Sequence, residues 1–222
     1  MDPAAGIAAH VTRLLVDRTR VLVAIDGPDA AGKTTLADQV AGRLGGDAVR
    51  ASVDDFHRPA AERAARGALS PDGYYWDTFA LDDVHVLLDS FAAGADEVTT
   101  RTFDLRADVP SIHRQRVPRR AALLVDGVFL LRPELRAHWD VTVYLHVSEA
   151  VTIERALHRD VQLFGDEQTV LTRYRSKYLP GQALYRSIAG PLESADLVID
   201  NTAPNAPVIL ADTERVLAER RD

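Results

Sequence analysis

The sequence of 222 residues predicts an α/β protein in which a mostly parallel five-stranded sheet is flanked by helices. Two observations carry this prediction. Short apolar, β-prone segments alternate with longer segments whose apolar residues repeat at helical spacing, the order typical of parallel strands with helices on both faces. Several of the short segments end at a carboxylate or a glycine-rich loop. Ligands bind beyond the carboxyl ends of such strands.

The amino-terminal part begins with helix and strand signals in alternation. Residues 4–18 repeat apolar side chains at helical spacing, which predicts an amphipathic helix that covers part of the sheet. Residues 21–26 form the short apolar run of a strand buried on both faces. Residues 36–44 return to helical spacing and stop at Gly45-Gly46, since glycine readily ends a helix. Alternation over residues 49–53 predicts a second strand.

The alternation continues to the end of the chain. The other expected elements are a helix over 84–91, strands over 97–103, 121–127, 141–147 and 195–201, a helix that begins after Ser148, and a helix over 170–178 that ends at Pro180. In the helix after Ser148, the expected apolar stripe is Ala150, Ile153, Leu157 and Val161. Residues 104–120 read as a long polar loop, and the chain after 201 as a loop and a charged tail.

The strongest single motif is GPDAAGKTT at residues 27–35, which completes the pattern G-x-x-x-x-G-K-[ST] between an expected strand and an expected helix. Its glycines let backbone N–H groups surround phosphate oxygens, and the helix N-terminus adds partial positive charge. Lys33 is expected to reach the β- and γ-phosphates, and the Thr34 hydroxyl to ligate Mg²⁺. The nucleotide-binding candidates in the loop are Gly27, Asp29, Ala30, Ala31, Gly32, Lys33, Thr34 and Thr35. The alternative is an ordinary glycine-rich turn.

Two carboxylates stand at neighbouring strand ends, which predicts chemistry beyond nucleotide binding. Asp54 follows the strand over 49–53, and Asp126 ends the strand over 121–127. Phosphoryl transfer to an alcohol needs Mg²⁺ and a carboxylate that orients the acceptor hydroxyl. We assign that catalytic role to Asp54, and Asp126 and Asp54 join Thr34 as expected metal-site residues. The alternative for each is a turn carboxylate.

Other classes of protein fit less well. Gly127 follows Asp126 where a motor ATPase usually carries a catalytic Glu, and the D-x-x-G and N-K-x-D patterns of GTPases do not occur in place. The formal net charge of −7 argues against general nucleic-acid binding, and no apolar run approaches a membrane span. The absence of Cys excludes disulfides and Cys-based zinc sites but leaves the redox compartment undetermined. Because the chain also lacks a basic, apolar secretory start, we expect a cytoplasmic protein. The sequence does not determine the oligomeric state, and a homo-oligomer is one of the possibilities.

Four motifs together resemble the uridine kinase-like family of P-loop kinases, which includes phosphoribulokinase and pantothenate kinase relatives. They are GPDAAGKTTLA at 27–37, SVDDFH at 52–57, LLVDGVF at 123–129 and ADLVIDNT at 195–202, and the likeness spans nearly the whole chain. The resemblance implies a P-loop NTPase fold with a nucleoside-monophosphate-kinase-like sheet and a helical, arginine-bearing lid. It also implies ATP with Mg²⁺ as the phosphoryl donor.

The resemblance assigns roles to individual residues. Asp54 matches the family's catalytic carboxylate, Thr34 its metal hydroxyl, and Asp126 a metal-linked acid. Arg155 and Arg159 match the start of the lid helix, where they would neutralise the phosphates and exclude water; alternatively, they only solvate a helix face. Lys33 and Arg159 join Asp54 as expected catalytic residues. One kinase domain is expected over 1–222, with a lid over about 150–180 and acceptor-site insertions over about 56–80 and 101–120.

The acceptor site is the part that the motifs define least. Its candidates are Asp54, His57, Tyr75, Asp77, Phe103, Asp104 and Arg106. Asp108 stands where pyrimidine kinases of the family carry a His, and Leu163 to Asp166 replace further lid arginines. The sequence therefore predicts an ATP-dependent kinase for a primary hydroxyl of a small metabolite, with a nucleoside such as uridine as the first candidate. The alternatives are a kinase for pantothenate or a sugar or sugar phosphate, and a nucleotide-binding regulatory module with little turnover.

Overall fold

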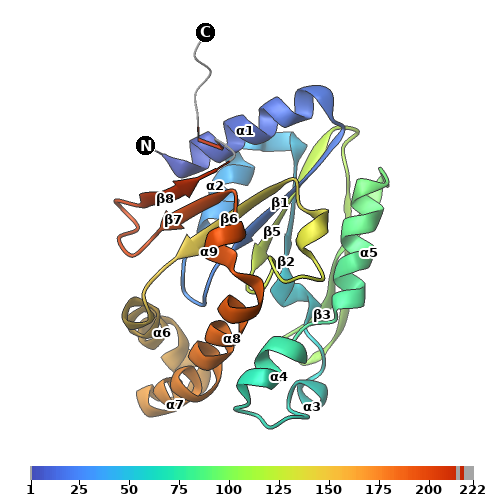
Figure 1. Cartoon of the computed structure of the whole chain (residues 1–222). Coiled ribbons are helices and arrows are strands. Elements are labelled where there is room, and N and C mark those ends of the chain that lie inside the picture. Colours follow the sequence, from blue (N-terminus) through green and yellow to red (C-terminus); the bar gives the residue numbers. More distant parts are fainter. Residues whose placement is uncertain (1, 214–215, 218–222) are drawn as a thin grey trace.

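A computed structural model describes residues 2–213 and 216–217. In this part of the chain, six strands form the main sheet in the order β2-β5-β1-β6-β7-β8 (Figure 1). These strands are β1 (Arg20–Asp26), β2 (Ala48–Ser52), β5 (Ala121–Gly127), β6 (Val141–His146), β7 (Leu197–Asp200) and β8 (Val208–Asp212). All neighbours pair in parallel except β7 and β8, which are antiparallel. The predicted α/β class and mostly parallel sheet are confirmed.

Helices cover both faces of this sheet. The α-helices are α1 (Pro3–Asp17), α2 (Lys33–Leu44), α3 (Ala60–Arg63), α4 (Pro71–Trp76), α5 (Leu81–Ala92), α6 (Glu149–Phe164), α7 (Glu167–Arg173), α8 (Leu179–Ala189) and α9 (Pro191–Ser194). Shorter turns are η1 (Gly45–Asp47), η2 (Val53–Phe56), η3 (Arg136–His138) and the π-helical η4 (Tyr174–Tyr178). A separate hairpin consists of β3 (Glu97–Asp104) and β4 (Val109–Arg116).

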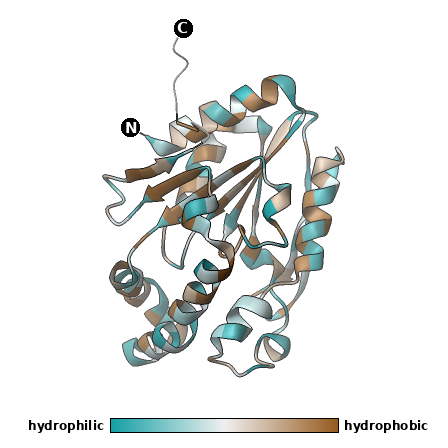
Figure 2. Cartoon of the chain, viewed as in Figure 1, coloured by the Kyte–Doolittle hydropathy of each residue, from teal (hydrophilic) through white to brown (hydrophobic). Residues whose placement is uncertain are grey.

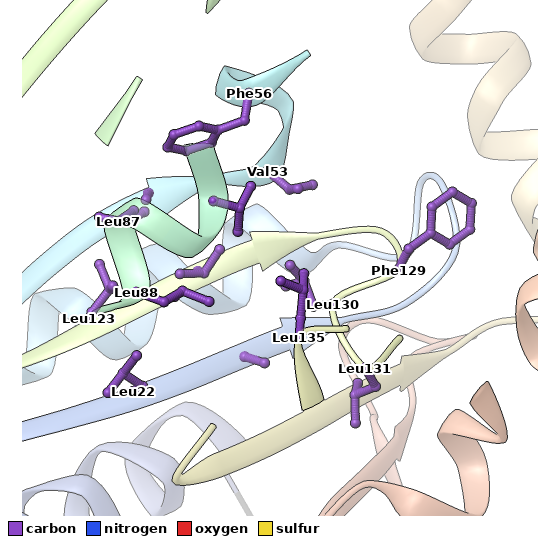
Figure 3. Close-up of a cluster of buried hydrophobic side chains, with 14 of the residues drawn as sticks. Leu22, Val53, Phe56, Leu87, Leu88, Leu123, Phe129, Leu130, Leu131 and Leu135 are labelled. Carbon is purple, nitrogen blue, oxygen red and sulfur yellow. The ribbon is translucent and has the colours of Figure 1, made fainter. Parts of the chain in front are cut away.

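The core has two layers because side chains of each strand alternate between the faces. Val21, Val23 and Ile25 of β1 pack with α1 and α2 on one face. Leu22 and Ala24 face the other side, toward α5 and the segment after β5. Figure 3 shows this second layer, and Figure 2 shows that apolar residues concentrate in the strands while the outer helix faces are polar. Strands buried on both faces read as continuous apolar runs, as predicted.

The sequence prediction was wrong in four places. The main sheet has a sixth strand, β8, in the region expected to be a loop, and β4 lies within the expected polar loop over 104–120. The helical segment continues beyond Pro180 through α8, and Pro180 lies in the first turn of α8, where proline is tolerated. The buried positions of α6 are Thr152, Ala156 and Asp160, whereas Ala150 is exposed. Ser148 caps α6 as expected, since its hydroxyl accepts from the Val151 N–H at 3.3 Å.

Two groups of helices project from the end of the sheet at which β1, β2 and β5 finish (Figure 1). One group contains α6, α7 and α8, and the other contains α3 and α4. The phosphate-binding loop lies between β1 and α2 at the same end. The sheet therefore brings the loop and the carboxylates that follow β2 and end β5 to one place, with helices on either side. That α6 and α7 act as a lid remains a prediction.

Candidate active site

The phosphate-binding loop is held by the segment that follows β7. Gly32 has a φ of 92°, a left-handed conformation that favours glycine, and a Cβ there would lie 2.9 Å from Asn201 Nδ2. The same Asn201 amide donates to the Ala31 carbonyl at 2.7 Å. Lys33 Nζ donates to the Pro28 carbonyl at 2.7 Å, so the ammonium lies against the loop. Because the N-terminus of α2 begins here, the loop favours an anion.

Asp126 connects the loop to the sheet. The Thr34 hydroxyl donates to Asp126 Oδ2 at 2.6 Å, and Arg50 donates to the other carboxylate oxygen at 2.9 Å. Asp126 is 2% exposed, and Arg50 also pairs with Asp38 at 3.1 Å. A hydroxyl and a carboxylate in contact are hard oxygen donors of the kind that Mg²⁺ prefers. Thr34 and Asp126 therefore fit a magnesium site that a bound nucleotide would complete. No group of three or more His, Asp or Glu side chains able to hold a metal occurs within residues 2–213 and 216–217.

Asp54 and Asp55 lie side by side in η2 but have different environments. Asp55 pairs with Arg101 of β3 at 2.6 Å, whereas no side chain in the described ranges hydrogen-bonds to the Asp54 carboxyl. Asp54 is exposed at the surface, but the protein atoms around it partly desolvate its carboxyl, which raises its pKa to about 6. Lys33 and Arg159 act against the shift, while Asp29 and Asp126 add to it. These predicted site residues are therefore near enough for their charges to act on the Asp54 carboxyl.

His57 turns back onto the same segment. Its Nδ1 lies 2.8 Å from the Asp54 backbone carbonyl, and its ring meets the edge of Phe79 at 4.8 Å. A carbonyl can only accept, so Nδ1 donates, and Nε2 of the neutral ring is left as an acceptor. Burial lowers the pKa of His57 to about 4, although the Asp54 carbonyl acts against the shift, and the charges of Arg63 and Lys177 lower it further. His57 is therefore neutral at pH 7.

Asp26 is a third acidic group at a strand end, and it is fully buried. Its oxygens accept from the backbone N–H groups of Gly27 at 2.6 Å and Leu131 at 3.0 Å, and from the Tyr185 hydroxyl. Burial raises the pKa of Asp26 to about 6, and the three donors and Lys33 oppose the shift. Asp26 thus ties the start of the phosphate-binding loop to α8, with no access for a ligand.

Arg155 and Arg159, one turn apart on α6, make different contacts. Arg155 donates to the carbonyls of Ala30 at 3.1 Å, Asn201 at 2.8 Å and Thr202 at 3.0 Å. It therefore braces the phosphate-binding loop against the segment after β7. Arg159 pairs with Asp160 at 2.6 Å and donates to the Tyr174 hydroxyl at 3.2 Å, and more than half of its side chain is exposed. Its charge lowers the pKa of Asp54, so Arg159 lies toward the expected reaction centre.

The predicted acceptor residues do not gather at one point. Tyr75 is fully buried, with Arg132 over its ring at 4.5 Å, so its side chain is not open to an acceptor. Its neighbour Tyr74 instead donates to Asp29 of the phosphate-binding loop at 2.8 Å. Asp77 is paired with Arg66 at 2.8 Å.

The hairpin candidates have structural contacts of their own. Phe103 is 4% exposed, and Asp104 accepts from the backbone of Arg106 and Ala107 in the hairpin turn. These two hydrogen bonds lower the pKa of Asp104. Arg106 is exposed. Asp108 ties the hairpin to α3, since it accepts from the Ala60 N–H at 3.0 Å and pairs with Arg63 at 3.1 Å.

Sequence reasoning missed Arg50, and a second contact to the predicted machinery comes from Tyr74. Arg50 contacts Asp126 from β2, and its signal was a lone arginine between the apolar residues Val49 and Ala51. Tyr74 contacts Asp29, but the sequence offers no means to choose it over Tyr75 before the helix orientation is known. Both contacts join residues that lie 45 or more positions apart.

The phosphate-binding loop, the Thr34–Asp126 contact and the carboxylate after β2 define a P-loop protein of the phosphotransferase class. Residues 22–206 match the Phosphoribulokinase / Uridine kinase family, and the chain belongs to that family. The predicted resemblance is thereby confirmed, and membership supports a P-loop small-molecule kinase that uses ATP. The search of curated proteins gives no match.

Solved structures with low sequence identity share the fold. A possible uridine kinase from Bacillus stearothermophilus is 22% identical with a TM-score of 0.66, over 86% of this chain and 97% of that one. A candidate fructose transport system kinase from a Silicibacter species is 23% identical with a TM-score of 0.68, over 82% and 95%. D-Glycerate 3-kinase from Cryptococcus neoformans is 13% identical with a TM-score of 0.55, over 82% and 86%.

The search for a membrane-spanning element gave a negative result. Across the described ranges, each helix is either too short or too polar to traverse a lipid bilayer.

Proposed function

We propose that this protein transfers the γ-phosphoryl group of ATP to a hydroxyl group of a small metabolite. The observation that carries the proposal is the placement of Asp54. Its carboxyl is open to water and lacks a side-chain hydrogen bond within the described residues, yet it lies within range of the charges of Lys33, Asp126 and Arg159. A carboxylate in this position can orient an acceptor hydroxyl toward a phosphate held by the loop.

Each residue has a definite part in the proposed reaction. Lys33 and the loop amides hold the β- and γ-phosphates, and Arg159 offsets negative charge on the transferring group. The acceptor oxygen forms a bond to the γ-phosphorus while the bond from phosphorus to the ADP oxygen breaks, and the hydroxyl proton passes to Asp54. With a pKa of about 6, Asp54 is ionised at pH 7 and can still accept that proton as it is released.

Thr34 and Asp126 are the residues that would hold Mg²⁺. Held there, the metal would neutralise negative charge on the phosphates. In the protein itself, Arg50 occupies one oxygen of Asp126 and Thr34 the other, so the carboxylate is held in a fixed orientation before the nucleotide arrives.

The identity of the acceptor is a finer proposal. A nucleoside such as uridine is the first candidate from the sequence motifs, and pantothenate or a sugar or sugar phosphate are the alternatives. Asp77 is paired with Arg66, and Asp104 accepts local backbone hydrogen bonds, so both of these acceptor-site candidates are already engaged. These contacts therefore give no preference for a nucleoside over a sugar.

A coupled ADP-release assay with a panel of acceptors tests the proposal. We expect ADP release that depends on one class of acceptor and on Mg²⁺, and loss of that release in Asp54→Asn with ATP binding retained. A regulatory module would bind Mg·ATP, release no ADP with any acceptor, and be indifferent to Asp54→Asn. Failure of every nucleoside would remove uridine from consideration.

A further inference from the structure

Lys177 is a half-buried ammonium without an acidic partner. It lies in η4, a π-helical turn between α7 and α8, and such turns are frequent at functional sites. Its Nζ lies 5.9 Å from the centre of the Tyr74 ring and 5.7 Å from that of Tyr178. None of the carboxylates in the described ranges forms an ion pair with it.

The groups around Lys177 are positive or neutral. Burial lowers the pKa of Lys177, and the charges of Arg63 and Arg173 lower it further. Arg63 is itself held by Asp108 at 3.1 Å and by the Arg58 carbonyl at 2.7 Å. A half-buried positive charge without a counter-ion is costly to a folded protein. The cost is recovered when an anion binds.

Lys177 lies near the segment that carries Asp54. His57, whose pKa both Lys177 and Arg63 lower, hydrogen-bonds to the backbone of Asp54. The Tyr74 ring separates Lys177 from Asp29, because Tyr74 contacts the ammonium with its ring face and Asp29 with its hydroxyl. Lys177 therefore lies on the ring side of Tyr74, whose hydroxyl contacts the loop, and near enough to His57 for its charge to lower the pKa of that ring.

We propose that Lys177, with Arg63 beside it, binds an anionic group of the acceptor, so that the substrate is a small alcohol that carries a carboxylate or a phosphate. This inference rests on the proposed kinase function. The hydroxyl of the acceptor would meet Asp54, and its anionic group would meet Lys177. His57 Nε2, the acceptor nitrogen of a neutral ring, could take a hydrogen bond from a second hydroxyl between them. A neutral nucleoside would leave the ammonium unpaired.

Matched pairs of acceptors test the inference on the full chain. Glycerol and D-glycerate differ by a carboxylate, D-fructose and D-fructose 6-phosphate differ by a phosphate, and uridine represents the neutral nucleosides. We expect ADP release with at least one anionic member and a kcat/KM at least tenfold above that of its neutral partner. A preference for D-glycerate over glycerol would show that the subsite binds a carboxylate, and a preference for D-fructose 6-phosphate over D-fructose would show that it binds a phosphate.

Variants of η4 then assign the effect to one side chain. Lys177→Met should raise KM for the anionic acceptor roughly 10- to 100-fold, because a charge-assisted hydrogen bond is lost. KM for ATP should stay within about twofold, and Lys177→Arg should restore most of the acceptor affinity. Arg175→Met is the matched control, since Arg175 is exposed on the same turn. Thermal melting of each variant checks that the fold is retained.

The outcomes separate the two proposals. Preference for uridine or for the neutral members, or an unchanged acceptor KM in Lys177→Met, would overturn the anionic subsite and leave the kinase function standing. Binding of Mg·ATP without ADP release from any member of the panel would overturn the kinase function and this inference together.

Discussion

Asp26 at the end of β1 and Asp54 after β2 share a raised pKa of about 6, for which desolvation is the main cause, yet they differ in exposure and in hydrogen bonding. Asp26 is fully buried and accepts from Gly27, Leu131 and Tyr185. Asp54 faces water, and its neighbours act on it through charge. A raised pKa alone therefore does not identify a catalytic carboxylate. What distinguishes Asp54 is an oxygen that a substrate can reach.

The two carboxyl groups also serve different parts of the molecule. Asp26 links three segments, since the loop after β1, the segment after β5 and α8 all donate to it. Asp54 is placed by η2 and is left available because its neighbour Asp55 takes the pairing with Arg101. Replacement of Asp26 should therefore affect stability, and replacement of Asp54 should affect turnover.

The largest expected effect is that of Asp54→Asn. We expect kcat to fall roughly 10²- to 10⁴-fold, because an amide cannot accept the acceptor proton. The dissociation constant for Mg·ATP, measured by calorimetry, should change by no more than about threefold. Asp55→Asn is the matched control, since it alters an adjacent carboxylate that is paired with Arg101. Equal losses of kcat in both variants would refute the role of Asp54.

The pH dependence of kcat/KM distinguishes Asp54 from Asp26. Asp54 must be ionised to act, so kcat/KM should fall about tenfold per pH unit below a pH of about 6 and level off above it. Asp26→Asn should keep this inflection if Asp54 causes it. Loss of the inflection in Asp26→Asn, with the variant still folded, would assign the titration to the buried group instead.

Asp26→Asn should chiefly reduce stability. Asparagine has one acceptor oxygen where the carboxyl group has two, so a buried donor loses its partner at a cost of about 1–3 kcal/mol. The melting temperature should fall by roughly 2–4 °C for each kcal/mol. We expect kcat to change by no more than about threefold. A loss of turnover as large as that of Asp54→Asn, in a variant of unchanged melting temperature, would contradict this division.

The stability of Asp26→Asn should also differ in its pH dependence. The folded pKa of Asp26 is about 6 against an ordinary 3.8, so between these values the folded state holds a proton that the unfolded state has released. This group therefore lowers the stability of the wild type as pH rises from about 4 to about 6. The difference in unfolding free energy between wild type and Asp26→Asn should shrink over that range. Urea titrations at several pH values measure it, and a difference that grows with pH would contradict the assignment.

Tyr185→Phe should have the smallest effect. It removes one of three donors to Asp26 and leaves the backbone donors in place, which predicts a loss of about 0.5–1.5 kcal/mol in unfolding free energy. Turnover should stay within about twofold. Urea unfolding and the ADP-release assay check both values, and a loss of kcat above tenfold would show that the link to α8 takes part in the reaction.

The buried centre of the fold was predictable because apolar runs such as Ala121–Gly127 have few alternatives to a buried strand. The exposed strands β4 and β8 were not predictable, since most of their side chains face solvent and show no apolar alternation. β4 forms because it pairs with β3, and β8 forms because it pairs with β7. Such pairing cannot be predicted from the sequence of the strand itself.

The candidate site divides in the same way. Lys33, Thr34 and Asp126 follow from a contiguous motif and from the rule that strand ends meet, and the Thr34–Asp126 contact bears out their predicted proximity. The role of Arg50 depends on its contact with the distant Asp126, and that of Lys177 on the lack of an acidic partner in the described ranges. The local sequence pattern predicts neither. Their assignments, like the roles of the other site residues, stay proposals.

Calorimetric titration of the protein with Mg·ATP is the most direct test of the mechanism, because every step needs a polyphosphate held by the loop. We predict saturable binding with a dissociation constant in the micromolar to millimolar range usual for enzyme substrates. Lys33→Met, which keeps the length of the side chain and removes its charge, should weaken that binding at least tenfold. The absence of binding for both Mg·ATP and Mg·GTP, with the protein folded, would contradict the mechanism.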